Sequence, residues 1–170
     1  MRSILLCLNR QRDNGRVLIC IPSWLRNTGN GRSASDEAVA DGGTRRMDVY
    51  AARLTELIQA DAWFSSILKA VRDCDPPDWL VGGGVLRNLA WDHLHGYTTT
   101  ATALRHVDVA YFDAGDLRNV RDHEVERCLC ARLPGVPWQA KNQAAVHLWY
   151  ERVFGFPVQP LASSADGVGT

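Results

Sequence analysis

The sequence predicts an α/β protein, with a small mixed sheet and helices on one side and around it. A short apolar strand at residues 79–81 runs through Gly82-Gly-Gly84 into a helix, and a second strand follows at residues 106–112. Longer helical patterns flank both strands. Strands and helices therefore alternate along the chain, as they do in α/β domains.

Length and composition indicate an ordinary globular domain. The 170 residues suffice for one hydrophobic core, and the contents of 46% hydrophobic and 22% charged residues are typical of soluble proteins. A formal net charge of zero argues against a general nucleic-acid binder. We expect no membrane span, because the longest apolar runs are only a few residues, against the roughly 18–20 that a bilayer requires.

The first 46 residues differ in composition from the rest. They hold eight arginines and four acids, a net charge of +4, whereas residues 47–170 have a net charge of −4. Residues 27–35 contain mainly Asn, Gly and Ser, which predicts a disordered linker. We expect residues 1–46 to be a disordered or non-native N-terminal extension, with Met47 as the natural start and residues 47–170 as the domain.

The cysteines predict neither a disulfide framework nor a zinc site. There are five, an odd number, at irregular spacings. Cys128 and Cys130 lie in a helical pattern, and no second Cys/His pair completes a metal site. A reducing, cytoplasmic setting is therefore expected.

Helical periodicity begins near Met47. Apolar residues recur at three- and four-residue spacing from Val49 to Val71, which predicts one or two amphipathic helices. The segment Asp73–Asp78 contains two prolines and should end the last of them.

The glycine run comes next. Glycine permits positive φ and close approach of a ligand, and a following helix presents free N–H groups to phosphate. The run has neither GxGxxG spacing nor the Lys-Ser/Thr of a P-loop. By itself it is equally consistent with a tight strand–helix turn that binds nothing.

The second strand carries a candidate metal pair. Because side chains alternate across a strand, His106 and Asp108 share a face. Mg²⁺ prefers oxygen ligands, which Asp108 supplies, whereas imidazole suits Mn²⁺, Zn²⁺ or Fe²⁺ better. The alternative is that Asp108 is a surface acid near a strand end and His106 a polar filler.

The C-terminal part predicts a helix at residues 118–133, a turn, a strand at residues 138–141 and a further helix at residues 142–153. Lys141 is a candidate for phosphate contact. Asn142 is a good helix N-cap. Asp113 is expected to close the second strand, with a role in the site as the alternative.

Three segments together resemble a known family: Trp91-Asp-His-Leu-His-Gly96, Val109-Ala-Tyr-Phe-Asp113 and Lys141-Asn-Gln-Ala144. They are similar to a bacterial family of uncharacterised nucleotidyltransferase-like proteins, placed in the superfamily related to DNA polymerase beta. The similarity runs from about Met47 to the C-terminus. It implies a nucleotidyltransferase fold, glycines 82 and 83 facing a triphosphate, and a two-acid strand motif that binds Mg²⁺.

The chain departs from this family at three places. His106 stands where the family usually has Asp. The usual site of the superfamily has a third carboxylate on a later strand, and none occurs near residues 138–142, where Asn142 or Gln139 takes its place. The family pattern also continues beyond Thr170, so the chain looks truncated. Aromatic side chains near that end would then form an exposed apolar patch: Trp149, Tyr150, Phe154 and Phe156.

The predicted function is transfer of a nucleoside monophosphate from an NTP to an acceptor that the sequence does not name. Asp108 is the expected main metal ligand and His106 the second. The expected phosphate contacts are Gly82, Gly83, Arg87 and, less strongly, Lys141. Activity with Mg²⁺ should be weak or absent, and Mn²⁺ should restore part of it. The alternatives are a catalytically inactive relative that binds nucleotide or a protein partner, and a domain whose glycine turn is purely structural. The oligomeric state is left open.

Overall fold

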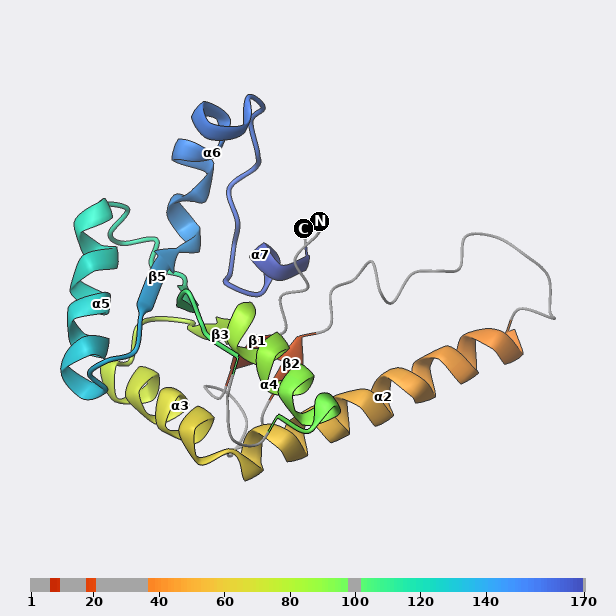
Figure 1. Ribbon diagram of the computed structural model, residues 1–170. Helices are drawn as coiled ribbons and strands as arrows, with labels where there is room; N and C mark the ends of the chain where they lie inside the picture. Colours follow the sequence, from red (N-terminus) through yellow and green to blue (C-terminus); the bar gives the residue numbers. More distant parts are fainter. Residues whose placement is uncertain (1–6, 10–17, 21–36, 98–101, 170) are drawn as a thin grey trace.

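The computed structural model describes residues 7–9, 18–20, 37–97 and 102–169. These residues form one sheet of strand order β2-β1-β3-β4-β5 with helices around it (Figure 1). β3 pairs antiparallel with β1 and β4, and β4 pairs parallel with β5. The predicted α/β class with a small mixed sheet is confirmed. The elements are β1 (Cys7–Asn9), β2 (Leu18–Cys20), α2 (Glu37–Ala60), α3 (Ala62–Cys74), β3 (Leu80–Gly82), α4 (Gly84–His95), β4 (Val107–Tyr111), α5 (Asn119–Arg132), β5 (Trp138–Asn142), the 3₁₀ helix η1 (Gln143–Ala145), α6 (Val146–Phe154) and α7 (Asp166–Gly169).

The hydrophobic core lies between one face of the sheet and the helices α3 and α5. Alternate residues of β4 are buried, and the two between them, Asp108 and Ala110, are only partly buried. Because side chains alternate across a strand, Asp108 lies on the face opposite the core. The central core residues are Val81, Val107, Val109, Tyr111 and Ala140 of the strands with Phe64, Ile67, Val71, Val125 and Leu129 of the helices.

The helical pattern that begins near Met47 forms two helices, and local capping separates them. The Asp61 side chain accepts a hydrogen bond of 2.6 Å from the Phe64 amide, which starts α3. α3 ends at Cys74, and Asp75 follows with a left-handed φ of 46°. The predicted break at residues 73–78 is therefore confirmed. No helix in the described part of the chain is long and apolar enough to cross a membrane.

The outer edge of β5 is covered by the acidic side chains of α5. The Ala140 amide donates to Glu126 Oε1 at 3.0 Å, and the Asn142 amide donates to Asp122 Oδ1 at 2.9 Å. The two amides are two residues apart on the strand, and the two acids are four residues apart on the helix. These steps cover nearly the same length, so each acid faces one amide. These bonds satisfy amides that an edge strand would otherwise expose for pairing.

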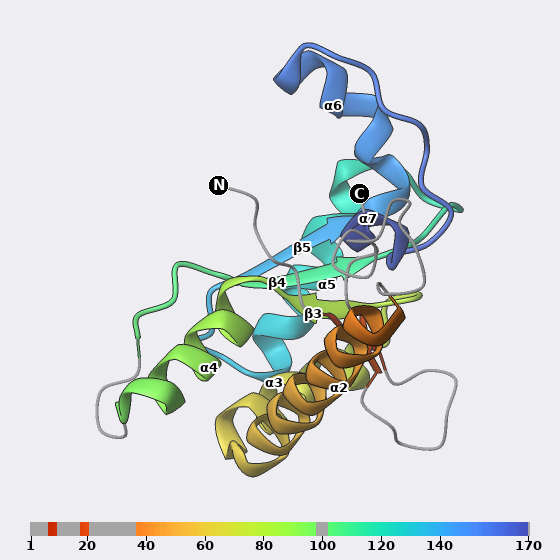
Figure 2. The ribbon, with the colours of Figure 1, turned by 90° about the vertical axis from the view of Figure 1, so that its right-hand side faces the viewer.

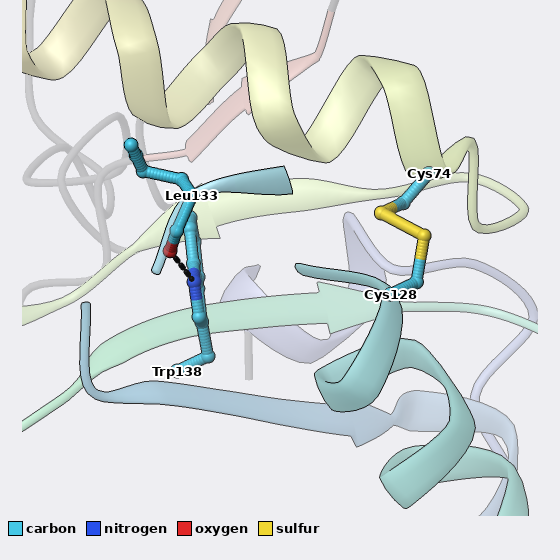
Figure 3. Close-up of a disulfide and its surroundings, with 4 residues drawn as sticks. All are labelled: Cys74, Cys128, Leu133 and Trp138. Atoms are coloured by element: carbon cyan, nitrogen blue, oxygen red, sulfur yellow. Dashed lines mark hydrogen bonds between the residues drawn. A yellow bond between two sulfur atoms is a disulfide. The ribbon is translucent and has the colours of Figure 1, made fainter. Parts of the chain in front are cut away.

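A disulfide joins the end of α3 to α5, so the expectation that the cysteines form no disulfide is wrong. Cys74 and Cys128 are 54 residues apart in sequence, and their Cα atoms lie 5.9 Å apart, within the range that a disulfide requires. Figure 3 shows the bond between the two helices, and it also draws Trp138, whose indole N–H donates to the Leu133 carbonyl at 3.2 Å. The spacing in sequence gave no signal, because only the packing of α3 against α5 brings the two residues together. Cys130, two residues further along α5, is a free and exposed thiol.

The predicted domain boundary at Met47 falls inside a helix. α2 begins at Glu37, and β1 and β2 also lie within residues 1–46. The predicted linker at residues 27–35 lies outside the described residues. That residues 1–46 are a disordered or non-native N-terminal extension stays a prediction.

α6 and the segment after it project from the body of the molecule, at the top of Figure 2. No residue of α6 is buried. Phe154 and Phe156 are 54% and 53% exposed, and both rings lie close to that of Tyr150. Of the four aromatic side chains expected to form an exposed patch, Phe154 and Phe156 are exposed, whereas Trp149 and Tyr150 are partly buried.

Candidate functional site

The glycine run turns β3 into α4, and its middle residue has two reasons to be glycine. Gly83 has φ 73° and ψ −135°, a conformation that L side chains rarely adopt. A Cβ at this position would also overlap the carboxylate of Asp108. Gly82 lies directly opposite Asp108 in the β3–β4 pairing. Glycine therefore allows the turn to lie against the acid.

Asp108 is partly buried beneath this turn. Burial raises the pKa of Asp108 above its ordinary value, while the His106 charge and the amide of Gly84, the first residue of α4, act in the opposite direction. The site thus holds one acid at the positive end of a helix dipole. The sequence predicted Gly82 and Gly83 as phosphate contacts but not Gly84, although the glycine run includes all three.

His106 lies just before β4, and its Nε2 is 3.3 Å from Asp108 Oδ1. The predicted shared face is therefore observed as direct contact. The two side chains are 47% and 35% exposed, so solvent reaches both. Two ligands at right angles on one octahedral cation, each about 2.1 Å from it, lie about 3 Å apart. The His106–Asp108 pair could therefore bind one cation with only a small adjustment.

Gln139 is the β5 residue paired with Asp108. Paired residues on neighbouring strands point to the same face, and Gln139 is exposed. It therefore lies beside Asp108 on the exposed face of the sheet and offers a neutral amide oxygen there. No group of three or more His, Cys, Asp or Glu residues suited to a metal occurs in the described part of the chain.

Arg87 lies one turn into α4. Its Nη2 is 3.6 Å from where a Cβ on Gly84 would stand, so the guanidinium covers the turn. Its hydrogen bonds to Asn88 Oδ1 are long, at 3.4 Å, and among the described residues it forms no ion pair. A cation held beside Gly84 without an acidic partner remains available to an anion.

Lys141 has a partner already. Its Nζ lies 2.6 Å from Asp122 Oδ2 on α5, and in the strand pairing it stands opposite Ala110, two residues beyond Asp108. Its ammonium group thus contacts α5. The structure does not bring Lys141 together with the glycine turn, and its predicted phosphate contact stays a prediction.

Asn142 fixes the loop that follows β4. Its Oδ1 accepts hydrogen bonds from the amides of Asp113 and Ala144, and its Nδ2 donates to the carbonyls of Asp113 and Asp116. The predicted N-cap role is confirmed for the 3₁₀ helix η1. Asp113 closes β4, with its carboxylate 3.4 Å from Arg121 Nε. All the hydrogen-bonding groups of the Asn142 side chain are used in this structural role.

A cavity of about 740 Å³ lies on another side of α4, between that helix, α3 and the end of α2. Its lining is mainly apolar and includes Leu57, Phe64, Leu89 and Val136. Asp92, one of its few acids, is already bonded to the amide and hydroxyl of Thr102. Neither the three glycines of the turn nor Asp108 lines this cavity, so the cavity and the Asp108 site are separate features.

Comparison with known proteins identifies the family. A family model described as nucleotidyltransferase matches residues 69–170, which is more than half of the chain. The chain therefore belongs to this nucleotidyltransferase family. No curated protein and no solved structure matches it. The match contains the glycine turn, the Asp108 strand and the segment around Lys141, all predicted as parts of the site. Bacterial origin and the relation to DNA polymerase beta stay predictions.

Proposed function

We propose that this protein binds a nucleoside triphosphate and transfers its nucleoside monophosphate to an acceptor, with reduced activity. The observation that carries the proposal is the contact between the Asp108 carboxylate and the Gly83-Gly84 turn at the start of α4. This contact joins the two parts that nucleotidyl transfer requires, a turn able to receive phosphate and an acid able to hold a cation.

The residues of the site divide the work between phosphate and cation. Gly82 and Gly83 allow the triphosphate to approach the backbone, and the N-terminal amides of α4 face its negative charge. Arg87, free of acidic partners among the described residues, binds phosphate oxygens. The attacking acceptor oxygen displaces pyrophosphate from the α-phosphorus in line, while these groups hold the phosphates in place.

The available donors suit Mn²⁺ better than Mg²⁺. Asp108 supplies a carboxylate oxygen and His106 an imidazole nitrogen, and Gln139 on the neighbouring strand supplies a neutral oxygen. Mg²⁺ favours oxygen ligands, whereas imidazole is a good ligand for Mn²⁺. A bound cation would stabilise the negative charge that develops on the phosphates during transfer.

Histidine at position 106 removes one negative charge from the metal pair. If this costs about 3 kcal/mol of transition-state stabilisation, the rate falls by about a hundredfold. We therefore propose weak turnover with Mg²⁺ and partial recovery with Mn²⁺. Rapid turnover with Mg²⁺ alone would contradict this proposal.

The test is a thermal-shift titration of the full chain with ATP and with CTP, each with Mg²⁺ or Mn²⁺. His106→Asp is the gain-of-function variant, and Asp108→Asn is the matched loss. A cation-dependent rise in Tm that is larger in His106→Asp and absent in Asp108→Asn supports a nucleotide site at Asp108. The absence of any shift in all three cooperatively melting proteins would refute it.

The second candidate is a catalytically inactive relative that binds nucleotide or a protein partner. His106 beside Asp108 favours it, since only one acid of the pair is present. Release of pyrophosphate from radiolabelled NTP, in the presence of a cell extract that supplies acceptors, separates the two. Binding without release, in the wild type and in His106→Asp alike, would favour the inactive relative.

A further inference from the structure

One exposed face of α4 carries a row of side chains that leads away from the glycine turn. Gly84, Arg87, Trp91 and His95 follow one another at spacings of three or four residues, so they share this face. The cavity uses other positions of the helix, among them Val85, Leu89 and Asp92. The row therefore begins at the proposed phosphate site and is distinct from the cavity.

Aromatic rings dominate the far end of this row. The Trp91 and His95 rings stack with centroids 4.0 Å apart and an interplanar angle of 22°, and the Tyr97 ring lies 5.9 Å from that of His95. Trp91 is 53% exposed and Tyr97 is 54% exposed. His95 Nδ1 lies 2.9 Å from the Trp91 carbonyl oxygen, to which it can only donate, and this contact holds the imidazole in its stacked position. The result is a preformed aromatic surface that the core does not use.

The spacing between the turn and this surface suits a nucleotide. Trp91 follows Gly84 by seven positions, which corresponds to about 10.5 Å along a helix axis. That rise is comparable with the span from the terminal phosphate of a nucleoside triphosphate to its base. Arg87 lies between the two ends, where it can reach the phosphates.

We propose that the base of the bound nucleoside triphosphate stacks on Trp91, with the His95 ring supporting the indole from its other side. The proposal rests on the proposed function, because the triphosphate must lie at the glycine turn for the base to reach Trp91. An aromatic platform accepts any base, since every base has a π face. A single nucleotide fits better than a long nucleic acid, because residues 47–170 have a net charge of −4.

The test compares two ligands that share a triphosphate and differ in the base. Isothermal titration calorimetry, with Mn²⁺ in excess, measures the Kd of ATP and of inorganic tripolyphosphate for the full chain. ATP is expected to bind at least about tenfold more tightly, as base stacking adds to phosphate binding. Trp91→Ala should remove this advantage and leave the Kd of tripolyphosphate unchanged.

Matched variants make the outcome specific. Trp63→Ala removes an exposed tryptophan that lines the cavity, and it should leave both Kd values unchanged. Trp91→Phe should keep most of the ATP advantage because it keeps a ring. Trp91→Leu keeps apolar bulk without a ring and provides the same test if Trp91→Ala does not fold.

Two results would overturn the stacking proposal while leaving the proposed function intact. One is equal affinity of the wild type for ATP and tripolyphosphate. The other is an ATP advantage that survives both Trp91→Ala and Trp91→Leu. If neither ligand binds the wild type at all, the proposed function fails, and the stacking proposal fails with it.

Discussion

Opening the Cys74–Cys128 disulfide should destabilise the fold substantially. The bond ties the end of α3 to α5 and closes a loop of 54 residues. For a loop of that length, the restraint on the unfolded chain is worth about 14 cal/mol/K, or about 4 kcal/mol at 25 °C. For a chain of this size, such a loss lowers Tm by roughly 8–16 °C.

The assay is thermal unfolding of the full chain, followed by circular dichroism, with and without a phosphine reductant. Counting free thiols before each scan establishes that the bond is closed in one sample and open in the other. The double variant Cys74→Ala/Cys128→Ala should melt like the reduced protein. Cys130→Ala is the control, because this cysteine is exposed and unpaired on the same helix, and its Tm should not change.

The prediction is wrong if the thiol counts show one closed and one open bond and the Tm values of the oxidised and reduced protein still agree within about 2 °C. Such a result would mean that contacts between α3 and α5 already restrict the unfolded chain, so that the bond adds nothing. The bond also makes the stability of the fold depend on its surroundings, because a compartment that keeps thiols reduced, such as the cytoplasm, would remove this stabilisation.

Three further predictions concern the site and its support. Gly83→Ala should lower the free energy of unfolding by about 2 kcal/mol or more and abolish nucleotide-dependent stabilisation, because φ is positive there and the new Cβ would overlap Asp108. Gly84→Ala is the control and should fold normally, because the nearest contact of its Cβ is Arg87 Nη2 at 3.6 Å. Asp122→Ala should lower the free energy of unfolding in urea by about 3 kcal/mol, because it leaves the Tyr111 hydroxyl and the Asn142 amide without an acceptor. Glu124→Ala should lower it by less than about 1 kcal/mol, the usual contribution of an exposed ion pair. The Arg118 guanidinium lowers the pKa of Asp116 to about 2, so the stability from this pair is full above pH 3.8 and is lost as the pH falls through about 2. Arg118→Ala should return the pKa of Asp116 toward 3.8 in an NMR titration, and an unchanged titration curve would show that the ion pair is absent in solution.

The local pattern was sufficient for the central unit of the fold. The β3–turn–α4 unit and β4 follow from residues close together in sequence: an apolar strand, three glycines, a helical period and then alternating β formers. The same short-range logic placed His106 and Asp108 on one face, because a strand repeats every two residues. It also identified Asn142 as an N-cap, since that role depends only on the next two or three residues.

The pairings between distant segments were not available from the sequence. Gln139 lies beside Asp108 only because β5 pairs with β4 in one particular register, and one residue of slip would turn it to the other face. The contact between Lys141 and Asp122, 19 residues away in sequence, likewise arises only because α5 packs along β5.

The sequence by itself determined the β3–turn–α4 unit, the strand β4 after it and the face that carries the acid, because these depend on side-chain periodicity and on the backbone freedom of glycine. Only the tertiary structure decided which residues meet across the fold: Cys74 with Cys128, Lys141 with Asp122, and the Gly83 turn with the Asp108 carboxylate. The physical reason is that such contacts arise from strand register and helix packing, which the whole core fixes together and no local pattern encodes.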